Sequence, residues 1–503
     1  MSSPHSLRAG PLRYDLRELA AHVGGALLAG EPALPIGGLA ADTRAVQPGD
    51  LFVAIRGERT DAHTLLPAAY AAGAHAALVD RDPGDLWGLR DVPAGLGVIR
   101  VPAVIPALGR LAARHLDGLR PRPTVVGVTG SVGKTGTRRL LAAALSAGGS
   151  VLDAEGSFNT EISLPLVCLR ARSDHRFVTL ELAMRGRGQI AYLAAICRPR
   201  VGVVTVIGDS HREQLGSRAA IAAAKAELLE ALPSCGLAVL NRDDPWQRRM
   251  AAQSRAPVVW YGLGAHADVT AQDIRTLPEG GLSVTALLAG RPVPLRLRLL
   301  GRPQLANALA ALACADRLGV EPQRAAAALG LVRAAEGRLH LRESGPLRIL
   351  DDTFNAAPQS MLAALEALAD LVPVGRRAAV LGDMLELGPA SIDGHRRVGE
   401  AAAAAGLSWL LAVGPRARDI AAGARQAGLP SARIHEVADR HEAASALPGL
   451  LAGAHEGTAV LVKGSHALGL EEVVGSLVEW SRARGPLGAG GAAPELPGGG
   501  GGP

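Results

Sequence analysis

The chain has 503 residues, of which 48% are hydrophobic and 20% charged, so it can form a core and about three domains of roughly 150 residues each. The formal net charge of +6 is small for this length, and no basic run alternates with aromatic residues, which argues against a nucleic-acid-binding protein. No run of about 18 apolar residues occurs, so we expect no membrane span.

The cysteines are Cys168, Cys197, Cys235 and Cys314. None belongs to a Cys-x-x-Cys pair, so neither a zinc site nor a disulfide framework is indicated. Reduced thiols are typical of the cytoplasm, and residues 1–14 lack the apolar core of a secretion signal. We therefore expect a cytoplasmic protein.

Short apolar strands alternate with alanine-rich helical stretches over residues 14–119. The run Asp-Leu-Phe-Val-Ala-Ile at 50–55 predicts a strand, and residues 66–72 predict a helix. The next segment, Arg-Pro-Arg-Pro-Thr at 120–124, predicts a hinge because prolines interrupt regular structure. We predict a small N-terminal α/β domain over 14–119.

The alternation continues over residues 120–330, which we predict as a central domain. Its predicted strands are residues 125–128, 177–182, 201–207 and 237–240. A helix is predicted over 217–232. Strands that alternate with helices favour a parallel sheet covered by helices.

A third block, residues 331–482, repeats the pattern. Its predicted strands are residues 347–350, 377–381, 409–413 and 459–462. This spacing predicts a Rossmann-like C-terminal α/β domain. Residues 483–503 are mostly Gly, Pro and Ala, so we expect a disordered tail that cannot bury enough apolar surface to fold.

The strongest chemical motif is Gly127-Val-Thr-Gly-Ser-Val-Gly-Lys-Thr-Gly-Thr137, between a predicted strand and a helix predicted over 138–147. Backbone N–H groups of such a turn close around phosphates. Lys134 would neutralise the β- and γ-phosphates, and Thr135 would bind Mg²⁺. Val128 stands where the standard P-loop has its first Gly. An ordinary glycine-rich turn is the alternative, but Gly-Lys-Thr in this context favours an ATP site.

Three further residues gain meaning only in combination. Glu181 ends a predicted strand, where a metal-binding acid belongs beside a P-loop. His211 follows the strand 201–207, and Lys225 lies on the predicted helix 217–232. Taken singly, each would more often be an exposed side chain.

Together these pieces resemble the Mur ligase family, over nearly the whole chain from Asp42 to Val474. Asp42-Thr-Arg44, the run 48–57, Asp61 and His63 are similar to the family's uridine-nucleotide domain. The resemblance implies that Thr43, Arg44, Asp61 and His63 bind a UDP-linked precursor. The run 241–245, Asn-Arg-Asp-Asp-Pro, is another family landmark.

In the centre, the run 129–135 is similar to the family's ATP loop and 221–228 to its helix with a modified lysine. The resemblance implies the following ATP-binding residues: Thr129, Gly130, Ser131, Val132, Gly133, Lys134, Thr135, Gly136, Asn307, Arg338 and Asp352. It implies catalytic roles for Lys134, Lys225 and His211. It also implies two Mg²⁺ sites, one at Thr135 and Glu181, the other at His211 and a carbamylated Lys225.

The C-terminal block resembles one branch of the family, which adds D-alanyl-D-alanine. The similar segments are residues 337–339, 351–361, 380–388 and 461–465. The resemblance implies an ADP-forming ligase of peptidoglycan synthesis. It would join D-alanyl-D-alanine to a UDP-N-acetylmuramoyl-tripeptide through an acyl phosphate, and we expect a monomer.

Several positions depart from this branch. Ala183 replaces a Gly, Thr160 and Ser163 replace an Asn and a Gly, and Pro303-Gln304 replaces His-Asn. Phe354 and Ala357 replace a Tyr and an Asn, which removes hydrogen-bonding groups near ATP or the amine.

Three alternatives remain open from the sequence. One is a divergent paralogue that joins another acid or amino acid. A folylpolyglutamate-type ligase is a second, against which Asp42-Thr-Arg44 argues. A non-catalytic P-loop protein is a third, which would tolerate loss of Glu181, His211 and Lys225, although all three are present.

Overall fold

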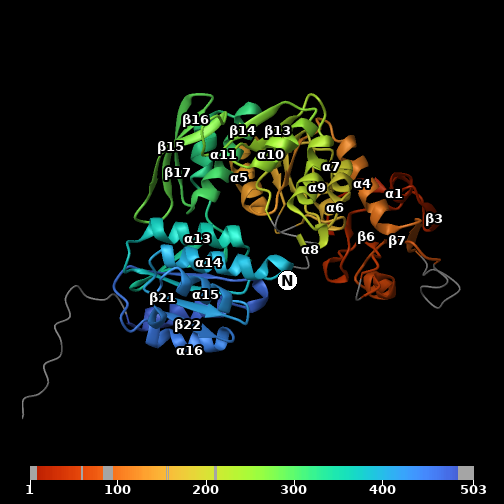
Figure 1. The fold of residues 1–503 in the computed structure, drawn as a ribbon. Coiled ribbons are helices and arrows are strands. Elements are labelled where there is room, and N and C mark those ends of the chain that lie inside the picture. Colours follow the sequence, from red (N-terminus) through yellow and green to blue (C-terminus); the bar gives the residue numbers. More distant parts are fainter. Residues whose placement is uncertain are drawn as a thin grey trace, which may run out of the picture. The chain divides into compact units, whose positions relative to one another are not determined.

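The computed structural model describes residues 8–57, 60–82, 95–154, 156, 158–208 and 212–484 (Figure 1). Their contacts divide them into two compact units. The first runs to residue 332 apart from two short segments, 276–281 and 299–301, which belong to the second unit with the residues from 333 onward. The first unit carries the N-terminal and central sheets, and the second carries the C-terminal sheet. This is the α/β fold class predicted from the sequence.

The N-terminal sheet is mainly parallel, with one antiparallel strand at each edge. In sheet order its strands are β1 (Arg8–Ala9), β5 (Gly38–Ala40), β6 (Asp50–Val53), β7 (Ala76–Val79), β8 (Gly97–Arg100) and β3 (Ala26–Ala29). A ribbon is formed by β2 (Tyr14–Asp15) and β4 (Pro35–Ile36). The helices are α1 (Leu16–Val23), α2 (Leu66–Ala71) and α4 (Val104–Gly118). The predicted strand at 50–55 and helix at 66–72 are both confirmed.

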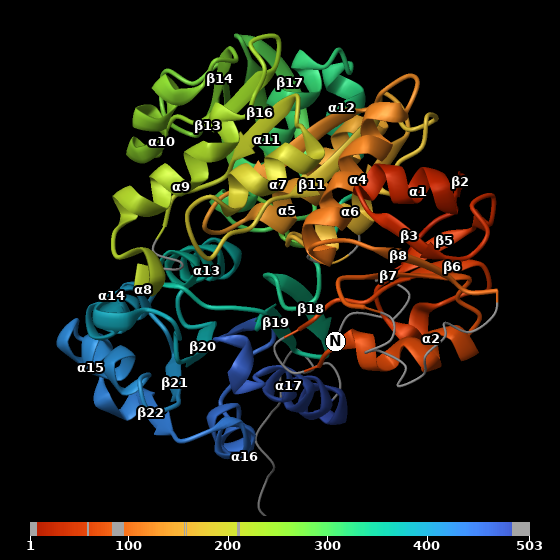
Figure 2. The same cartoon turned by 90° about the vertical axis from the view of Figure 1, so that its right-hand side faces the viewer.

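Helix α4 joins this sheet to the central domain. It lies beside α1 (Figure 2) and also contacts α6 (Ser163–Cys168) and α7 (Gln189–Cys197) of the central domain. His115 on α4 adds a polar link, since its Nε2 lies 2.8 Å from Ala171 O and its Nδ1 lies 2.9 Å from the Tyr14 hydroxyl. A carbonyl can only accept, so Nε2 donates and Nδ1 accepts from Tyr14. The two sheets therefore share one apolar core.

The central sheet is parallel through its first seven strands and ends in an antiparallel hairpin. In sheet order its strands are β10 (Val151–Asp153), β11 (Phe177–Glu181), β9 (Thr124–Thr129), β12 (Val201–Val204), β13 (Leu237–Asn241), β14 (Val258–Tyr261), β15 (Val269–Thr276), β16 (Leu282–Leu288) and β17 (Arg291–Leu297). The order places β9 between β11 and β12, where the direction of winding reverses. Ligands of open α/β sheets bind at the carboxyl ends of strands at such a point.

Helices cover this sheet. They are α5 (Lys134–Ser146), α6, α7, α8 (Arg212–Leu215), α9 (Arg218–Glu230), α10 (Pro245–Met250), α11 (Arg302–Arg317) and α12 (Pro322–Leu329). Helix α9 confirms the helix predicted over 217–232, with the Ser217 hydroxyl accepting from Ala220 N. None of the helices in the described residues is long and apolar enough to cross a membrane.

One helix boundary was predicted wrongly. Helix α5 begins at Lys134 rather than at residue 138. The polar run Lys-Thr-Gly-Thr hides the first turn from a search for apolar periodicity, whereas Gly133, with φ of +88°, ends the loop and starts the helix. Lys134 and Thr135 consequently belong to the first helical turn.

The C-terminal sheet is parallel except for one edge strand. In sheet order its strands are β18 (His340–Ser344), β19 (Leu347–Asp352), β23 (Thr458–Lys463), β20 (Arg377–Gly382), β21 (Trp409–Val413) and β22 (Ile434–Val437). The helices are α13 (Pro358–Leu371), α14 (Ser391–Ala404), α15 (Arg418–Gln426), α16 (Arg440–Leu450) and α17 (Glu471–Arg484). The four predicted strands are confirmed, and apolar clusters cover both faces. Helix α17 runs two residues past 482, and residues 485–503 of the expected tail lie outside the described residues.

Candidate active site

The loop between β9 and α5 has a backbone that glycine makes possible. Gly130 has φ of +151°, and a Cβ added to it would lie 1.8 Å from Thr205 Oγ1. The loop is also fastened to the chain after β12, because Ser131 N donates to Val206 O at 2.7 Å and Thr205 Oγ1 donates to Val132 O at 2.6 Å. The first N–H groups of α5 are thereby held at the loop, where they can meet an anion.

A polar chain crosses from this helix to the next strand. Thr135 Oγ1 donates to Glu181 Oε2 at 2.8 Å, and Asn159 Nδ2 donates to the other carboxylate oxygen at 2.9 Å. Glu181 is 3% exposed at the end of β11. The sequence did not single out Asn159 as a site residue, since it follows no strand and its partner is 22 residues away.

The oxygen donors at this point suit Mg²⁺. Thr135 and Glu181 offer a hydroxyl and a carboxylate side by side, and Mg²⁺ is usually held by one or two such protein oxygens together with waters and substrate phosphates. Within the described residues no group of three or more His, Cys, Asp or Glu forms a complete metal cage. His211, predicted for the second metal site, lies outside the described residues.

Two lysines approach the same region. Lys134 Nζ donates to Gly130 O at 3.0 Å, so the side chain folds back over the loop. Lys225 on α9 is 1% exposed, and burial holds its pKa well below the ordinary range, with the charge of Lys134 adding to this and Glu181 opposing it. Lys225 is therefore a buried amine whose surroundings disfavour the charged form, within electrostatic reach of Glu181 and Lys134.

Lysine is rare in this chain. Of 53 Lys and Arg residues, three are lysine: Lys134, Lys225 and Lys463. The first two lie at the loop and on α9, and arginine supplies the other basic side chains. This count is a signal in the sequence that would have marked Lys463, which motif reasoning left without a role.

Helix α11 brings Asn307 to the loop from the other side. Helices α5 and α11 lie side by side (Figure 1), and a Cβ added to Gly133 would lie 3.3 Å from the Asn307 amide. The departure at Gln304 belongs to the same place, because its Oε1 lies 3.5 Å from Asn307 Nδ2 and 3.5 Å from a Cβ added to Gly136. Gln304 thus keeps an amide beside the first turn of α5.

Thr160 and Ser163, which also depart from the family pattern, form hydrogen bonds with each other. Thr160 Oγ1 and Ser163 Oγ lie 3.0 Å apart, and each hydroxyl also accepts the backbone N–H of the other residue. The pair closes the turn that leads into α6, next to Asn159. The change from the family's Asn and Gly therefore leaves a hydrogen-bonded turn in place.

In the N-terminal domain, Arg44 forms a two-pronged ion pair with Asp42, with Nη2 2.6 Å from Oδ2. Thr43 and Arg44 begin the short helix η2 (Thr43–Ala45), which Asp42 caps. The Arg44 side chain is 70% exposed, so the pair is not buried. Its guanidinium is oriented by Asp42 and still faces solvent.

His63 is buried, unlike Arg44. Its Nδ1 lies 2.7 Å from Asp61 Oδ1, and its Nε2 lies 3.1 Å from Asp80 Oδ1. Asp61 also pairs with Arg81 at 2.8 Å. His63 therefore orients the Asp61 carboxylate, while its Nε2 accepts from Asp80 N at 3.3 Å. Its ring has no face toward solvent, while Asp61 and Arg81 remain partly exposed. Sequence reasoning missed Asp80 and Arg81, because they follow β7 and not the quoted motif.

In the second unit, Arg338 lies in the turn at residues 337–339, and Asp352 bonds to that turn. Asp352 Oδ1 accepts from Leu339 N at 2.9 Å, and the Arg338 guanidinium lies 3.8 Å from the centre of the Phe354 ring. Ala357 precedes α13, where Ser360 Oγ accepts from Ala357 N at 3.0 Å. Ser360 thus bonds to the Ala357 backbone, whereas Ala357 offers no side chain to accept from the first N–H groups of α13.

Comparison with known proteins identifies this arrangement. The Mur ligase middle domain matches residues 128–315, and the Mur ligase glutamate ligase domain matches residues 337–466. The UDP-N-acetylmuramoyl-tripeptide--D-alanyl-D-alanine ligase of Synechocystis is 38% identical over 88% of this chain and 92% of its own length. The chain belongs to the Mur ligase family.

Solved structures agree. A crystal structure of MurF from Acinetobacter baumannii has a TM-score of 0.84 at 27% identity, covering 94% of this chain and all of that chain. MurF ligase from Thermotoga maritima in complex with ADP has a TM-score of 0.77 at 28% identity, covering 89% and 98% of the two chains. The middle-domain match of this Mur ligase spans Thr135, Glu181, Lys225 and Asn307, and the C-terminal match spans Arg338 and Lys463.

The steric limit at Gly130 yields a prediction. Gly130→Ala should lower the free energy of unfolding of the central domain by about 2 kcal/mol, because the alanine would need a disfavoured φ and its Cβ would overlap Thr205. Urea unfolding measures this. Gly188→Ala is the matched control, since Gly188 also has positive φ (+82°) but no atom within 4 Å of its Cβ position. Equal losses in the two variants would contradict the steric account.

Proposed function

We propose that this Mur ligase joins D-alanyl-D-alanine to the terminal carboxylate of UDP-N-acetylmuramoyl-tripeptide, converting ATP to ADP and phosphate in peptidoglycan precursor synthesis. The observation that most supports this function is the glycine-rich loop Gly130–Thr135, whose Thr135 hydroxyl donates a hydrogen bond to Glu181. Relatives named for this activity match over more than nine-tenths of their own length, which supports it. The enzyme would act in the cytoplasm as a monomer.

The first chemical step is phosphoryl transfer. A carboxylate is a poor acyl donor because its leaving group would be oxide. One carboxylate oxygen of the precursor attacks the γ-phosphorus of ATP in line, the bond to the β–γ bridging oxygen breaks, and ADP leaves. Lys134 and the N–H groups of Gly130–Gly136 would offset the negative charge that spreads over the phosphoryl oxygens.

The second step forms the amide. The neutral amine of the dipeptide attacks the carbonyl carbon of the acyl phosphate, a tetrahedral intermediate forms, and phosphate departs as the amine loses its proton. Binding both substrates together supplies orientation, which accounts for a large part of such rate enhancements.

Metal ions would assist at two places. Thr135 and Glu181 would hold one Mg²⁺, and His211 with a carbamylated Lys225 would hold another. When bound, the ions neutralise phosphate charge and orient the phosphates. Carbamylation converts a buried amine into an anionic oxygen ligand, which suits the buried position of Lys225 beside Glu181 and Lys134.

We assign each domain one task. Residues 14–119 would bind the UDP end of the precursor, with Thr43, Arg44 and Asp61 in contact and His63 orienting Asp61 from within. Residues 120–330 would bind ATP through the loop and Asn307. Residues 331–482 would add Arg338 and Asp352 to the nucleotide and would border the path of the amine.

A ranking of amines tests the proposal. ADP release should be measured with the UDP-linked tripeptide and, in turn, D-alanyl-D-alanine, D-alanine and common L-amino acids. We expect the largest kcat/KM for the dipeptide. A single amino acid that exceeds it more than tenfold would instead identify a paralogue. Phe354 and Ala357 are the residues that favour the paralogue, because they remove a hydroxyl and an amide from the C-terminal motif.

Arg44→Ala should raise the KM for the UDP-linked precursor about tenfold, as expected for loss of a charge-assisted contact, and leave the KM for ATP unchanged. Steady-state kinetics with each substrate varied measures this. Arg172→Ala is a matched control, because Arg172 forms the same two-pronged pair with Asp174 on an exposed surface. Equal changes in both KM values would favour a structural role for Arg44.

Lys225→Ala should lower kcat by a factor of at least about 10², and added formate or acetate should restore part of it by replacing the carbamate oxygens. ¹³C-bicarbonate NMR should show a carbamate signal in the wild type that disappears in the variant. Lys225→Arg, which keeps a basic side chain but cannot be carbamylated, is expected to stay inactive without rescue. Full activity of Lys225→Ala would refute the carbamate.

A further inference from the structure

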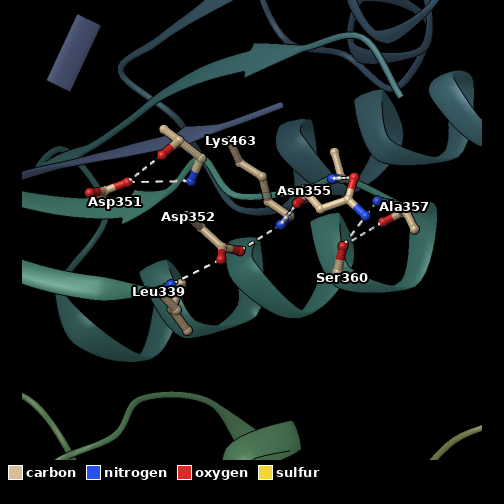
Figure 3. A network of polar contacts seen from close by, with 9 residues as sticks. Leu339, Asp351, Asp352, Asn355, Ala357, Ser360 and Lys463 are labelled. Atoms are coloured by element: carbon tan, nitrogen blue, oxygen red, sulfur yellow. Dashed lines mark hydrogen bonds and ion pairs between the residues drawn. The ribbon is translucent and has the colours of Figure 1, made fainter. Parts of the chain in front are cut away.

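Lys463 is the third lysine of the chain, and it is buried. It ends β23 and is 2% exposed. Asp352 ends the parallel neighbour β19 and is its partner across the sheet. Lys463 Nζ lies 2.7 Å from Asp352 Oδ2 and donates to Asn355 O at 2.7 Å, as Figure 3 shows. A buried ammonium requires such partners, so the three residues are held as one group.

Asp352 transmits this constraint to the turn that precedes β18. Its second oxygen, Oδ1, accepts from Leu339 N at 2.9 Å (Figure 3). Leu339 has φ of +52°, a conformation that a leucine rarely adopts unless its surroundings impose it. The turn is held from its other end by Phe354 N, which donates to Gly337 O at 2.9 Å. Arg338 stands between these two fixed positions.

An aromatic contact orients the side chain of Arg338. Its guanidinium lies over the Phe354 ring, and the ring stacks on His466 with centroids 5.9 Å apart and planes 25° apart. His466 follows Lys463 by three residues. Contacts that start at the end of β23 therefore hold both the backbone and the side chain of Arg338.

Neighbouring groups have other partners. Asp351 accepts from the Thr353 hydroxyl and from Arg342, and Ser360 bonds with Ala357 (Figure 3). Among the described residues of this network, Asp352 is the carboxylate that links the Lys463 ammonium to the Arg338 turn. The choice of lysine fits, because a compact ammonium can sit between two oxygens in a space that a planar guanidinium would overfill.

We propose that Lys463 is a positioning residue of the nucleotide site: by holding Asp352 and Asn355 it fixes the 337–339 turn and so presents Arg338 to ATP. The proposal rests on the function proposed above, in which Arg338 and Asp352 bind the nucleotide. Lys463 itself does not touch the nucleotide. Its loss should therefore change nucleotide affinity and leave precursor affinity unchanged.

The test uses full-length protein and measures the Kd for ADP, the KM for ATP and for the UDP-linked precursor, and the Tm. Lys463→Met should raise the Kd for ADP and the KM for ATP about tenfold, with the precursor KM unchanged. Asp352→Asn should raise both by at least as much, because Asp352 also belongs to the proposed nucleotide site. The double variant should be no weaker than Asp352→Asn alone, because Lys463 acts through Asp352. Ser360→Ala, at the edge of the same network, should leave all affinities unchanged.

Lys463→Arg covers the case in which the methionine variant does not fold. It retains the positive charge, and we expect it to fold but to bind ADP about tenfold more weakly, because its longer planar group displaces Asp352. A lower Tm with unchanged ADP affinity in the lysine variants would overturn the proposal and leave a structural role. Additive effects of Lys463→Met and Asp352→Asn would also overturn it. Wild-type protein that does not bind ADP would refute the proposed function instead.

Discussion

The close approach of the β9–α5 loop to Thr205 is the constraint on which the rest of the central site depends. No side chain fits at Gly130, so the loop backbone lies directly against the chain that follows β12. Parallel register then places the end of β11 beside it, since Glu181 pairs with Val128. Thr135 reaches Glu181 because α5 starts at Lys134. The positions of the loop backbone, of the Thr135–Glu181 oxygen pair and of the loop lysine thus follow from one tight contact between neighbouring strands.

The second feature that organises this molecule is its use of buried lysines. Fifty-three basic residues are almost all arginine, which remains charged and suits exposed ion pairs such as Arg44 with Asp42. Two of the three lysines, Lys225 and Lys463, are buried. At Lys225 burial favours the neutral amine, whereas at Lys463 an adjacent carboxylate and a carbonyl stabilise the ammonium. The same residue type therefore serves opposite purposes, because the partners differ.

The departures from the family pattern are compensated locally in two places. Thr160 and Ser163 bond to each other, and Ser360 bonds to the backbone N–H and carbonyl of Ala357. Phe354 is different. It is 44% exposed and lies between Arg338 and His466, so loss of the Tyr hydroxyl changes a surface that faces solvent, and the ring is retained to orient an arginine.

The sequence by itself determined the α/β class, the parallel strands, the ATP loop and the family. These follow from short-range patterns: β-branched runs, glycines at fixed spacing, and motifs that fall within a few residues. The strands β15–β17 were not predicted, although the alternation of apolar and polar residues over Leu282–Leu288 is the usual signal of a half-buried strand. The start of α5 was not predicted because its first turn is polar.

Tertiary structure alone decided which groups meet. Asn159 bonds to Glu181 across 22 positions, His63 is buried between Asp61 and Asp80, and Lys463 bonds to Asn355 across 108 positions. Such pairs depend on which strand ends become neighbours in a sheet. β23 lies between β19 and β20, although among the described strands it comes last along the chain. No local pattern in the sequence encodes that insertion.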